Sequence, residues 1–216
     1  MLNFPASTEL HKRIPKQTLY RKLPLSATLK RCIVEQIKSI VWSHKLSADT
    51  LRVSTGKQVD EIQVIEISLT ERKFNEDVIR VLESMIPYSI LFLLEHNGRY
   101  QARISYKECS PKGDAKVLAS FHSSGWCLRE KLPCRLQGLT MDSIYENLVR
   151  QIAGKALTPP SPAESLEASV QRAREKCRLV KQITALKNKI RREKQLNRQV
   201  ELNRQVRLLQ AQLDSL

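Results

Sequence analysis

The sequence has few glycines and few aromatic residues, which are needed for phosphate-binding loops and for surfaces that stack bases. Its 216 residues include only six glycines, so a glycine-rich loop around a phosphate is not expected. The one candidate, Ser54-Thr55-Gly56-Lys57, contains a single glycine and predicts a turn. Aromatic residues make up 5 % of the chain, which is few for a surface that stacks nucleic-acid bases.

Long apolar runs and export signals are also missing. No stretch approaches the ~18 uncharged apolar residues that a membrane span needs. Residues 1–10 lack the positive start and apolar run of a secretory signal. An odd number of scattered cysteines argues against a disulfide scaffold and fits a reducing compartment. We therefore expect a cytoplasmic protein that does not bind membranes, with its cysteines at Cys32, Cys109, Cys127, Cys134 and Cys177.

Motifs for metals and for nucleophilic catalysis are absent as well. The chain has no Cys-x-x-Cys, no His-x-x-x-His and no Gly-x-Ser-x-Gly. Cys127, Cys134 and His122 are close in sequence, but cysteine is commonly a small buried hydrophobe. We expect neither a bound metal nor a cofactor.

What the chain does have is an excess of positive charge at its two ends. Lys and Arg number 37 against 22 Asp and Glu, a balance of +15, and residues 163–216 carry 13 against 6. Such a field attracts phosphate or acidic protein surfaces, although a long helix also needs Lys and Arg on its solvated face. The candidate nucleic-acid-binding residues are Lys12, Arg13, Lys16, Arg21 and Lys22 in an N-terminal arm, and Arg191, Arg192, Lys194, Arg198 and Arg204 in the tail.

The pattern over residues 1–157 predicts an α+β domain with a small, mostly antiparallel sheet. The prolines among the first 25 residues predict an irregular arm. Helical spacing predicts helices over residues 27–45, 76–86 and 141–153, and alternation or apolar runs predict strands over 59–69, 89–94, 100–106 and 117–121. Asn97-Gly98 marks a hairpin between the second and third of these strands, and residues 126–128 either continue the sheet or begin a loop.

Residues 158–162 form a proline-rich linker, and the following residues 163–216 contain neither glycine nor proline. Ser161, Pro162 and Glu164 fit a capping box that begins a long helix. Apolar residues then recur in steps of four and three, as in the seam of a coiled coil. The candidate partner-binding residues are Leu179, Ile183, Leu186, Ile190, Leu202, Val206, Leu209 and Leu213.

A tandem six-residue repeat, residues 196–201 and 202–207, separates the two halves of this seam. Because six is not seven, the halves are out of phase, which predicts a change of supercoil or a short break near residues 191–201. A single helix with an apolar seam is unstable alone. The tail therefore folds back on the domain, pairs with a second copy, or pairs with another protein.

One weak pattern points to catalysis. Glu66 within a strand and Glu95 at a strand end offer the two acids of a metal-dependent nuclease. Such a site also uses an acid and a lysine on the second strand of a hairpin, where this chain has Gln101-Ala102-Arg103. The simpler interpretation is that both glutamates are solvated residues of the sheet.

The chain resembles a bacterial family catalogued as domain of unknown function 4391. The resemblance lies in Arg13-Ile14-Pro15-Lys16 with Leu19-Tyr20, and in residues 40–51, 61–69 and 86–107. It carries no catalytic signature. Proteins of this kind look like genomic neighbours of helicases and DNA methyltransferases of restriction or phage-defence type, which implies an accessory role.

Together these observations favour a non-enzymatic accessory protein. Its tail would dock to a partner or to a second copy, and its basic arm and tail would bring the assembly to DNA. The alternatives are a metal-dependent nuclease using Glu66 and Glu95, and a self-associating structural protein.

Overall fold

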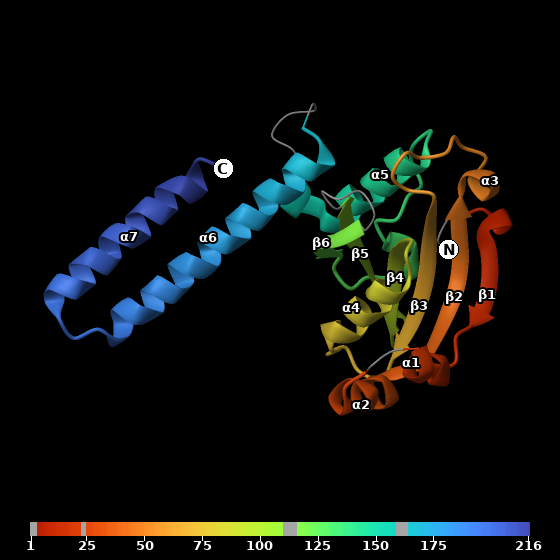
Figure 1. Ribbon diagram of the computed structural model, residues 1–216, viewed down its shortest axis with the longest axis horizontal. Coiled ribbons are helices and arrows are strands. Elements are labelled where there is room, and N and C mark those ends of the chain that lie inside the picture. The colour runs from red at the N-terminus through yellow and green to blue at the C-terminus, as the bar shows by residue number, and fades with distance from the viewer. Residues whose placement is uncertain (1–3, 23–24, 110–115, 159–163) are drawn as a thin grey trace. The chain divides into compact units, whose positions relative to one another are not determined.

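The structure is a computed structural model that describes residues 4–22, 25–109, 116–158 and 164–216 (Figure 1). The chain divides into two compact units, residues 1–154 and 155–216. The first is an α+β unit built on one sheet, which confirms the predicted fold class, and the second is helical.

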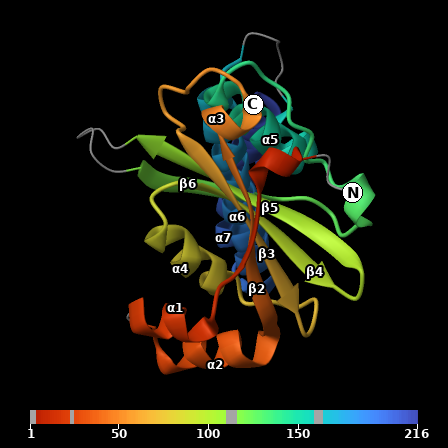
Figure 2. The same ribbon diagram turned by 90° about the vertical axis from the view of Figure 1, so that its right-hand side faces the viewer.

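The described part of the first unit contains a six-stranded sheet whose strands follow chain order (Figures 1 and 2). All neighbouring strands are antiparallel except β3 and β4, which are parallel and joined through helix α4 (Glu76–Met85). The strands are β1 (Glu9–Arg13), β2 (Ile37–Ser47), β3 (Glu61–Leu69), β4 (Ser89–His96), β5 (Arg99–Cys109) and β6 (Lys116–Ser123).

The helix predicted over residues 27–45 is wrong in its second half. Helix α2 is Ala27–Gln36, capped by Ser26, and the chain continues directly as β2. β-branched and aromatic residues favour a strand at Ile40-Val41-Trp42. A bulge between Trp42 and His44 breaks the alternation of faces in β2, so the apolar spacing imitated a helix.

The N-terminal arm is more ordered than its prolines predicted. It contains a short 3-10 turn (Ala6–Thr8), the edge strand β1 and helix α1 (Lys16–Lys22). β1 pairs with β2, a segment that the sequence had assigned to a helix, so its partner was hidden. This pairing and the reassigned β2 account for the two strands beyond the four that were expected.

One face of the sheet is covered by α1, α2 and α4. The core on this face contains Leu19 of α1, Ile33 of α2 and Ile79 of α4, packed on Ile67 of β3 and Phe92 of β4.

The predicted hairpin between β4 and β5 is confirmed, because Asn97 and Gly98 both have positive φ, at 49° and 72°, as a type I′ turn requires. Cys127 then pairs with Tyr100 at the start of β5.

Helix α5 (Met141–Ala153) lies in the range predicted for a helix, packs against β5 and β6, and buries its apolar residues, among them Ile144, Leu148 and Ile152. Thr140 caps it in a reciprocal capping box with Ser143, and Gly154 follows with φ 53°. The shorter helical segments of this unit are α3 (Ala48–Leu51) and a 3-10 turn at Arg129–Lys131, and a further 3-10 turn (Gly154–Leu157) follows α5.

The second unit contains α6 (Leu166–Arg192) and α7 (Leu196–Asp214), which pack side by side as an antiparallel hairpin. The break predicted near residues 191–201 lies at 193–195. The predicted start of the helix is wrong: α6 is capped by Ser165, while Ser161 and Pro162 lie outside the described residues. No helix in the described part of the chain has the length and apolarity to cross a membrane.

Candidate functional site

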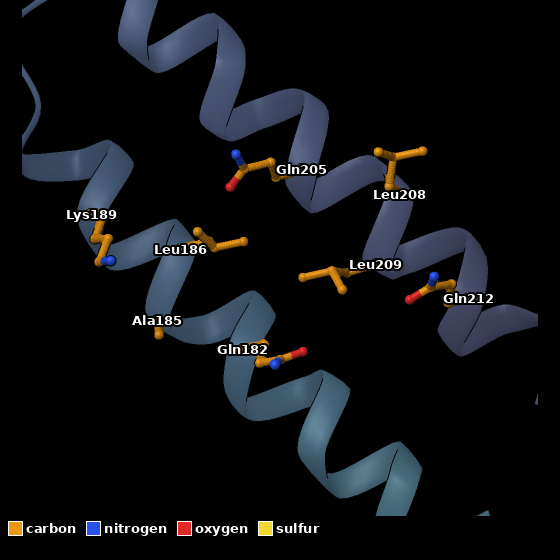
Figure 3. A pocket seen from close by; sticks show the side chains of 8 residues that line it. All are labelled: Gln182, Ala185, Leu186, Lys189, Gln205, Leu208, Leu209 and Gln212. Carbon is orange, nitrogen blue, oxygen red and sulfur yellow. The ribbon is translucent and has the colours of Figure 1, made fainter.

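A groove of about 520 Å³ opens between α6 and α7 (Figure 3). We call it the hairpin groove. Leu186 of α6 and Leu209 of α7 point toward one another across it. Its walls combine aliphatic groups with neutral amides, and Lys189 is the charged residue among its described lining residues. The lining residues are Gln182, Ala185, Leu186, Lys189, Gln205, Leu208, Leu209 and Gln212.

The hairpin brings the two halves of the predicted seam together but covers them unevenly. Leu179, Ile183 and Val206 are buried, whereas Leu186 and Leu209 remain half-buried. Two helices give each other only one side of cover, so an apolar seam between them stays open on its flanks. Outside the seam, α7 also exposes Leu208 by 60 % and Val200 by 61 %. The other half-buried seam residues are Ile190, Leu202 and Leu213.

The predicted tail cations gather where the chain turns from α6 to α7. Arg191 and Arg192 end α6, Lys194 lies in the break, and Arg198 is in the first turn of α7; all four are exposed, as is Arg204 further along α7. The Glu193 carboxylate accepts hydrogen bonds from the backbone N–H groups that follow it. The hydrogen bond from Gln195 N–H is the main reason that the pKa of Glu193 is lowered.

The predicted arm cations lie in the other unit. Lys12 and Arg13 are exposed on β1, and Lys16 begins α1. The Lys16 ammonium donates hydrogen bonds to the carbonyl oxygens of Val34, at 3.3 Å, and Ile37, at the end of α2. The side chains of Arg21 and Lys22 lie outside the described residues. The arm and tail cations thus belong to separate units of the chain.

The two carboxylates of the nuclease hypothesis lie on one face of the sheet but each has a partner. Glu66 forms an ion pair with Arg129, Nη2 to Oε2 at 2.9 Å, and that guanidinium also stacks on the Tyr100 ring at 5.0 Å. Glu95 accepts a hydrogen bond from the Gly98 N–H in the hairpin turn. Arg129 is 63 residues from Glu66, and no local sequence signal links them. Among the described residues, no group of three or more His, Cys, Asp or Glu side chains is placed to hold a metal ion.

The loop with the single Gly-Lys pair binds a carboxylate of the chain itself. Asp142, in the first turn of α5, accepts hydrogen bonds at 2.7–3.1 Å from the backbone N–H groups of Lys57, Gln58 and Val59. A Cβ atom on Gly56 would lie 2.4 Å from Asp142 Oδ1, which explains the glycine. The anion-binding geometry of this loop therefore serves to fasten it to α5.

A buried ion pair was also missed by the sequence analysis. The Lys107 ammonium of β5 lies 3.0 Å from the Glu83 carboxylate of α4, with 6 % and 2 % of the two side chains exposed. Burial raises the pKa of Glu83, and the nearby Lys107 partly opposes that rise. Lys107 also donates hydrogen bonds to the carbonyl oxygens of Ile86 and Tyr88. These contacts hold the connection between α4 and β4 against the sheet.

The Tyr145 hydroxyl donates a hydrogen bond to the backbone oxygen of Ser105, beside this pair. Burial raises the pKa of Tyr145, so its hydroxyl stays protonated and acts as a donor. The contacts of Lys107 and Tyr145 thus link β5 to α4 and α5.

The chain belongs to the family described as "Domain of unknown function (DUF4391)", whose model matches residues 2–213. No curated protein and no solved structure shows a significant match to the chain.

Proposed function

We propose that this family member is a non-enzymatic accessory protein whose hairpin groove binds a helix of a partner protein. The observation that supports the proposal is the open seam: Leu186 and Leu209 face one another, yet both remain half-buried. A third helix laid along the groove would cover them and complete a coiled-coil arrangement of three helices.

The charge of the hairpin favours a partner of opposite sign. Residues 163–216 carry 13 Lys and Arg against 6 Asp and Glu, so two copies stacked through this unit would bring like charges together. The described lining of the groove contains Lys189 and no carboxylate. We infer that the occupant is an amphipathic helix whose polar face is acidic, with its apolar side on the leucines and its polar side near Gln182 and Gln205.

The class of partner follows from the family resemblance. Proteins of this kind look like neighbours of helicases and DNA methyltransferases of restriction or phage-defence type. We propose that the acidic helix belongs to a subunit of such an enzyme and that the encounter takes place in the cytoplasm, where the free thiols of Cys32, Cys127, Cys134 and Cys177 stay reduced. The basic arm and tail would then bring the assembly to DNA.

The test uses two variants that differ in where they place a new charge. Leu208 lines the groove and Val200 does not, and both are more than half exposed on α7. Leu208→Asp should remove partner binding, because it places a carboxylate in the groove, and Val200→Asp should retain it. Both variants should fold like the wild type, since neither change disturbs a buried side chain. The measurement is affinity capture of the tagged full chain from the source organism after nuclease treatment, with the captured proteins identified by mass spectrometry.

The expected result is recovery of a helicase or methyltransferase subunit by the wild type and by Val200→Asp only. Equal recovery by all three proteins would contradict docking in the groove. Recovery of a second copy of the chain alone, with a doubled mass in light scattering, would favour the self-associating alternative instead.

A further inference from the structure

A second groove lies in the sheet unit, where the turn from β1 to α1 meets the beginning of β2. Its volume is about 550 Å³. We call it the arm cleft. The backbone N–H of Ile14 donates to the Ile40 oxygen at 2.9 Å, so the turn is fastened to the sheet rather than hanging beside it. The lining residues are Arg13, Ile14, Pro15, Lys16, Gln17, Lys38, Ser39 and Ile40.

The charge of this cleft has one sign. Three of its lining residues, Arg13, Lys16 and Lys38, are cationic, and none is acidic. Arg13 and Lys38 are exposed, and among the described residues neither forms an ion pair. Such a cleft concentrates positive potential and attracts anions.

Lys16 has a different role from the other two. Its ammonium donates to the carbonyl oxygens of Val34 and Ile37 at the C-terminal end of α2. Those carbonyls carry the negative end of the helix dipole, which would otherwise weaken the attraction for anions at this place. The Lys16 charge therefore offsets the negative potential at the C-terminal end of α2. Arg13 and Lys38 supply the exposed cations that can reach a ligand.

The remaining lining groups fit a sugar–phosphate chain. Gln17 and Ser39 offer neutral polar groups, and Ile14, Pro15 and Ile40 offer apolar surface. Two exposed cations in one cleft, Arg13 and Lys38, match the repeated charges of a phosphodiester chain better than a single carboxylate. The lining contains no aromatic residue, so contacts there position a backbone without stacking bases.

We propose that the arm cleft binds the phosphodiester backbone of nucleic acid, with Arg13 and Lys38 contacting phosphates. The site lies in the sheet unit and rests on the part of the proposed function in which the basic arm brings the assembly to DNA, but it does not depend on the hairpin groove. Binding there is independent of base sequence, and its strength falls steeply with salt because each contacted phosphate releases counterions.

The test measures binding of the full chain to a fluorescein-labelled DNA duplex of about 20 base pairs by fluorescence anisotropy over a range of salt concentrations. The test variant is Arg13→Gln with Lys38→Gln. The control is Arg52→Gln with Lys57→Gln, which removes the same charge from exposed residues of the same unit, beyond the other end of β2.

The cleft variant should weaken duplex binding about tenfold or more at low salt, and it should reduce the slope of log K against log[salt] by about 1.8, for two lost phosphate contacts. The control should keep both the affinity and the slope. Equal losses in the two variants would show general charge attraction and overturn the proposal, and so would an unchanged slope in the cleft variant.

Two further measurements distinguish failure of this proposal from failure of the hairpin proposal and from binding of acidic protein. A labelled polyglutamate peptide serves as the second probe, and loss of its binding in the cleft variant with duplex binding retained would assign the cleft to acidic protein and overturn the proposal. Leu208→Asp should bind the duplex like the wild type, because it lies in the other unit. Failure of the hairpin proposal would leave this result unchanged.

Discussion

Leu186 of α6 and Leu209 of α7 point toward one another across the hairpin groove, and each is only half-buried. They belong to two stretches of one apolar pattern that the break at residues 193–195 folds together. The same two side chains thus stabilise the hairpin and form the floor on which a third helix would lie.

Replacing both leucines by aspartate should open the hairpin. The two carboxylates would face one another in a partly apolar seam, and like charges in such a place repel. We expect loss of part of the helical signal in far-UV circular dichroism, together with loss of partner binding. Leu208→Asp should keep the helical signal, because Leu208 is 60 % exposed. A double variant with full helicity would show that the seam does not hold the hairpin.

Asp142→Asn should destabilise the sheet unit by about 1.5–3 kcal/mol, the range for hydrogen bonds to a charged group. The carboxylate accepts three backbone N–H groups of the loop at residues 57–59, and an amide offers a single acceptor atom. Urea unfolding followed by circular dichroism measures the change. Asp49→Asn is the control, since Asp49 lies exposed in the first turn of α3 and should cost less than about 1 kcal/mol.

Lys107→Met should destabilise the protein by about 3–5 kcal/mol, because it leaves the Glu83 carboxylate buried without its counter-ion. Adding Glu83→Met removes that unpaired charge and should recover much of the loss. The comparison is made by urea unfolding of the single and double variants. If the double variant is as unstable as the single one, the lost hydrogen bonds to Ile86 and Tyr88 matter more than the charge.

Acid should weaken the packing of the N-terminal arm through His44. This ring is 6 % exposed, stands edge-on to Phe4 at 5.2 Å, and has no partner for Nδ1 among the described residues. Burial lowers the pKa of His44 below the ordinary histidine value of about 6.5, so the unfolded chain binds the proton more tightly than the folded chain. This contribution to stability is present above about pH 6.5 and is lost as the pH falls toward the lower folded value.

The comparison of His44→Phe with the wild type isolates this effect, since other titrating groups are common to both. Urea midpoints measured at about pH 7.5 and about pH 5.5 should fall more for the wild type than for His44→Phe. Equal shifts in the two proteins would assign the acid sensitivity to other groups.

The parts of the fold that follow from local signals could be predicted from the sequence. The Asn97-Gly98 turn and the apolar run of β4 each depend on residues that are close together in the sequence. β1 could not be predicted, because its reason for being a strand is its pairing with β2, about 30 residues away.

The candidate surfaces were also predictable only in the features that depend on local sequence. The spacing of leucines predicted which side chains form the seam, and the charge excess pointed to the arm and tail. The hairpin groove depends on a sharp reversal at residues 193–195. The arm cleft has both Arg13 and Lys38 in its lining, and the pairing of β1 with β2 brings these two segments together. Neither the groove nor the cleft can be predicted from local sequence, because each joins segments that are far apart in the chain.

Photocrosslinking tests the docking of an acidic helix most directly. Benzoylphenylalanine is placed at Leu208, on the hairpin groove, or at Val200, outside it, in the full chain within the source organism. We predict that residue 208 crosslinks to an acidic helical segment of a helicase or methyltransferase subunit and that residue 200 does not. Crosslinking from both positions to the same protein in equal yield, or from residue 208 only to a second copy of this chain, would contradict it.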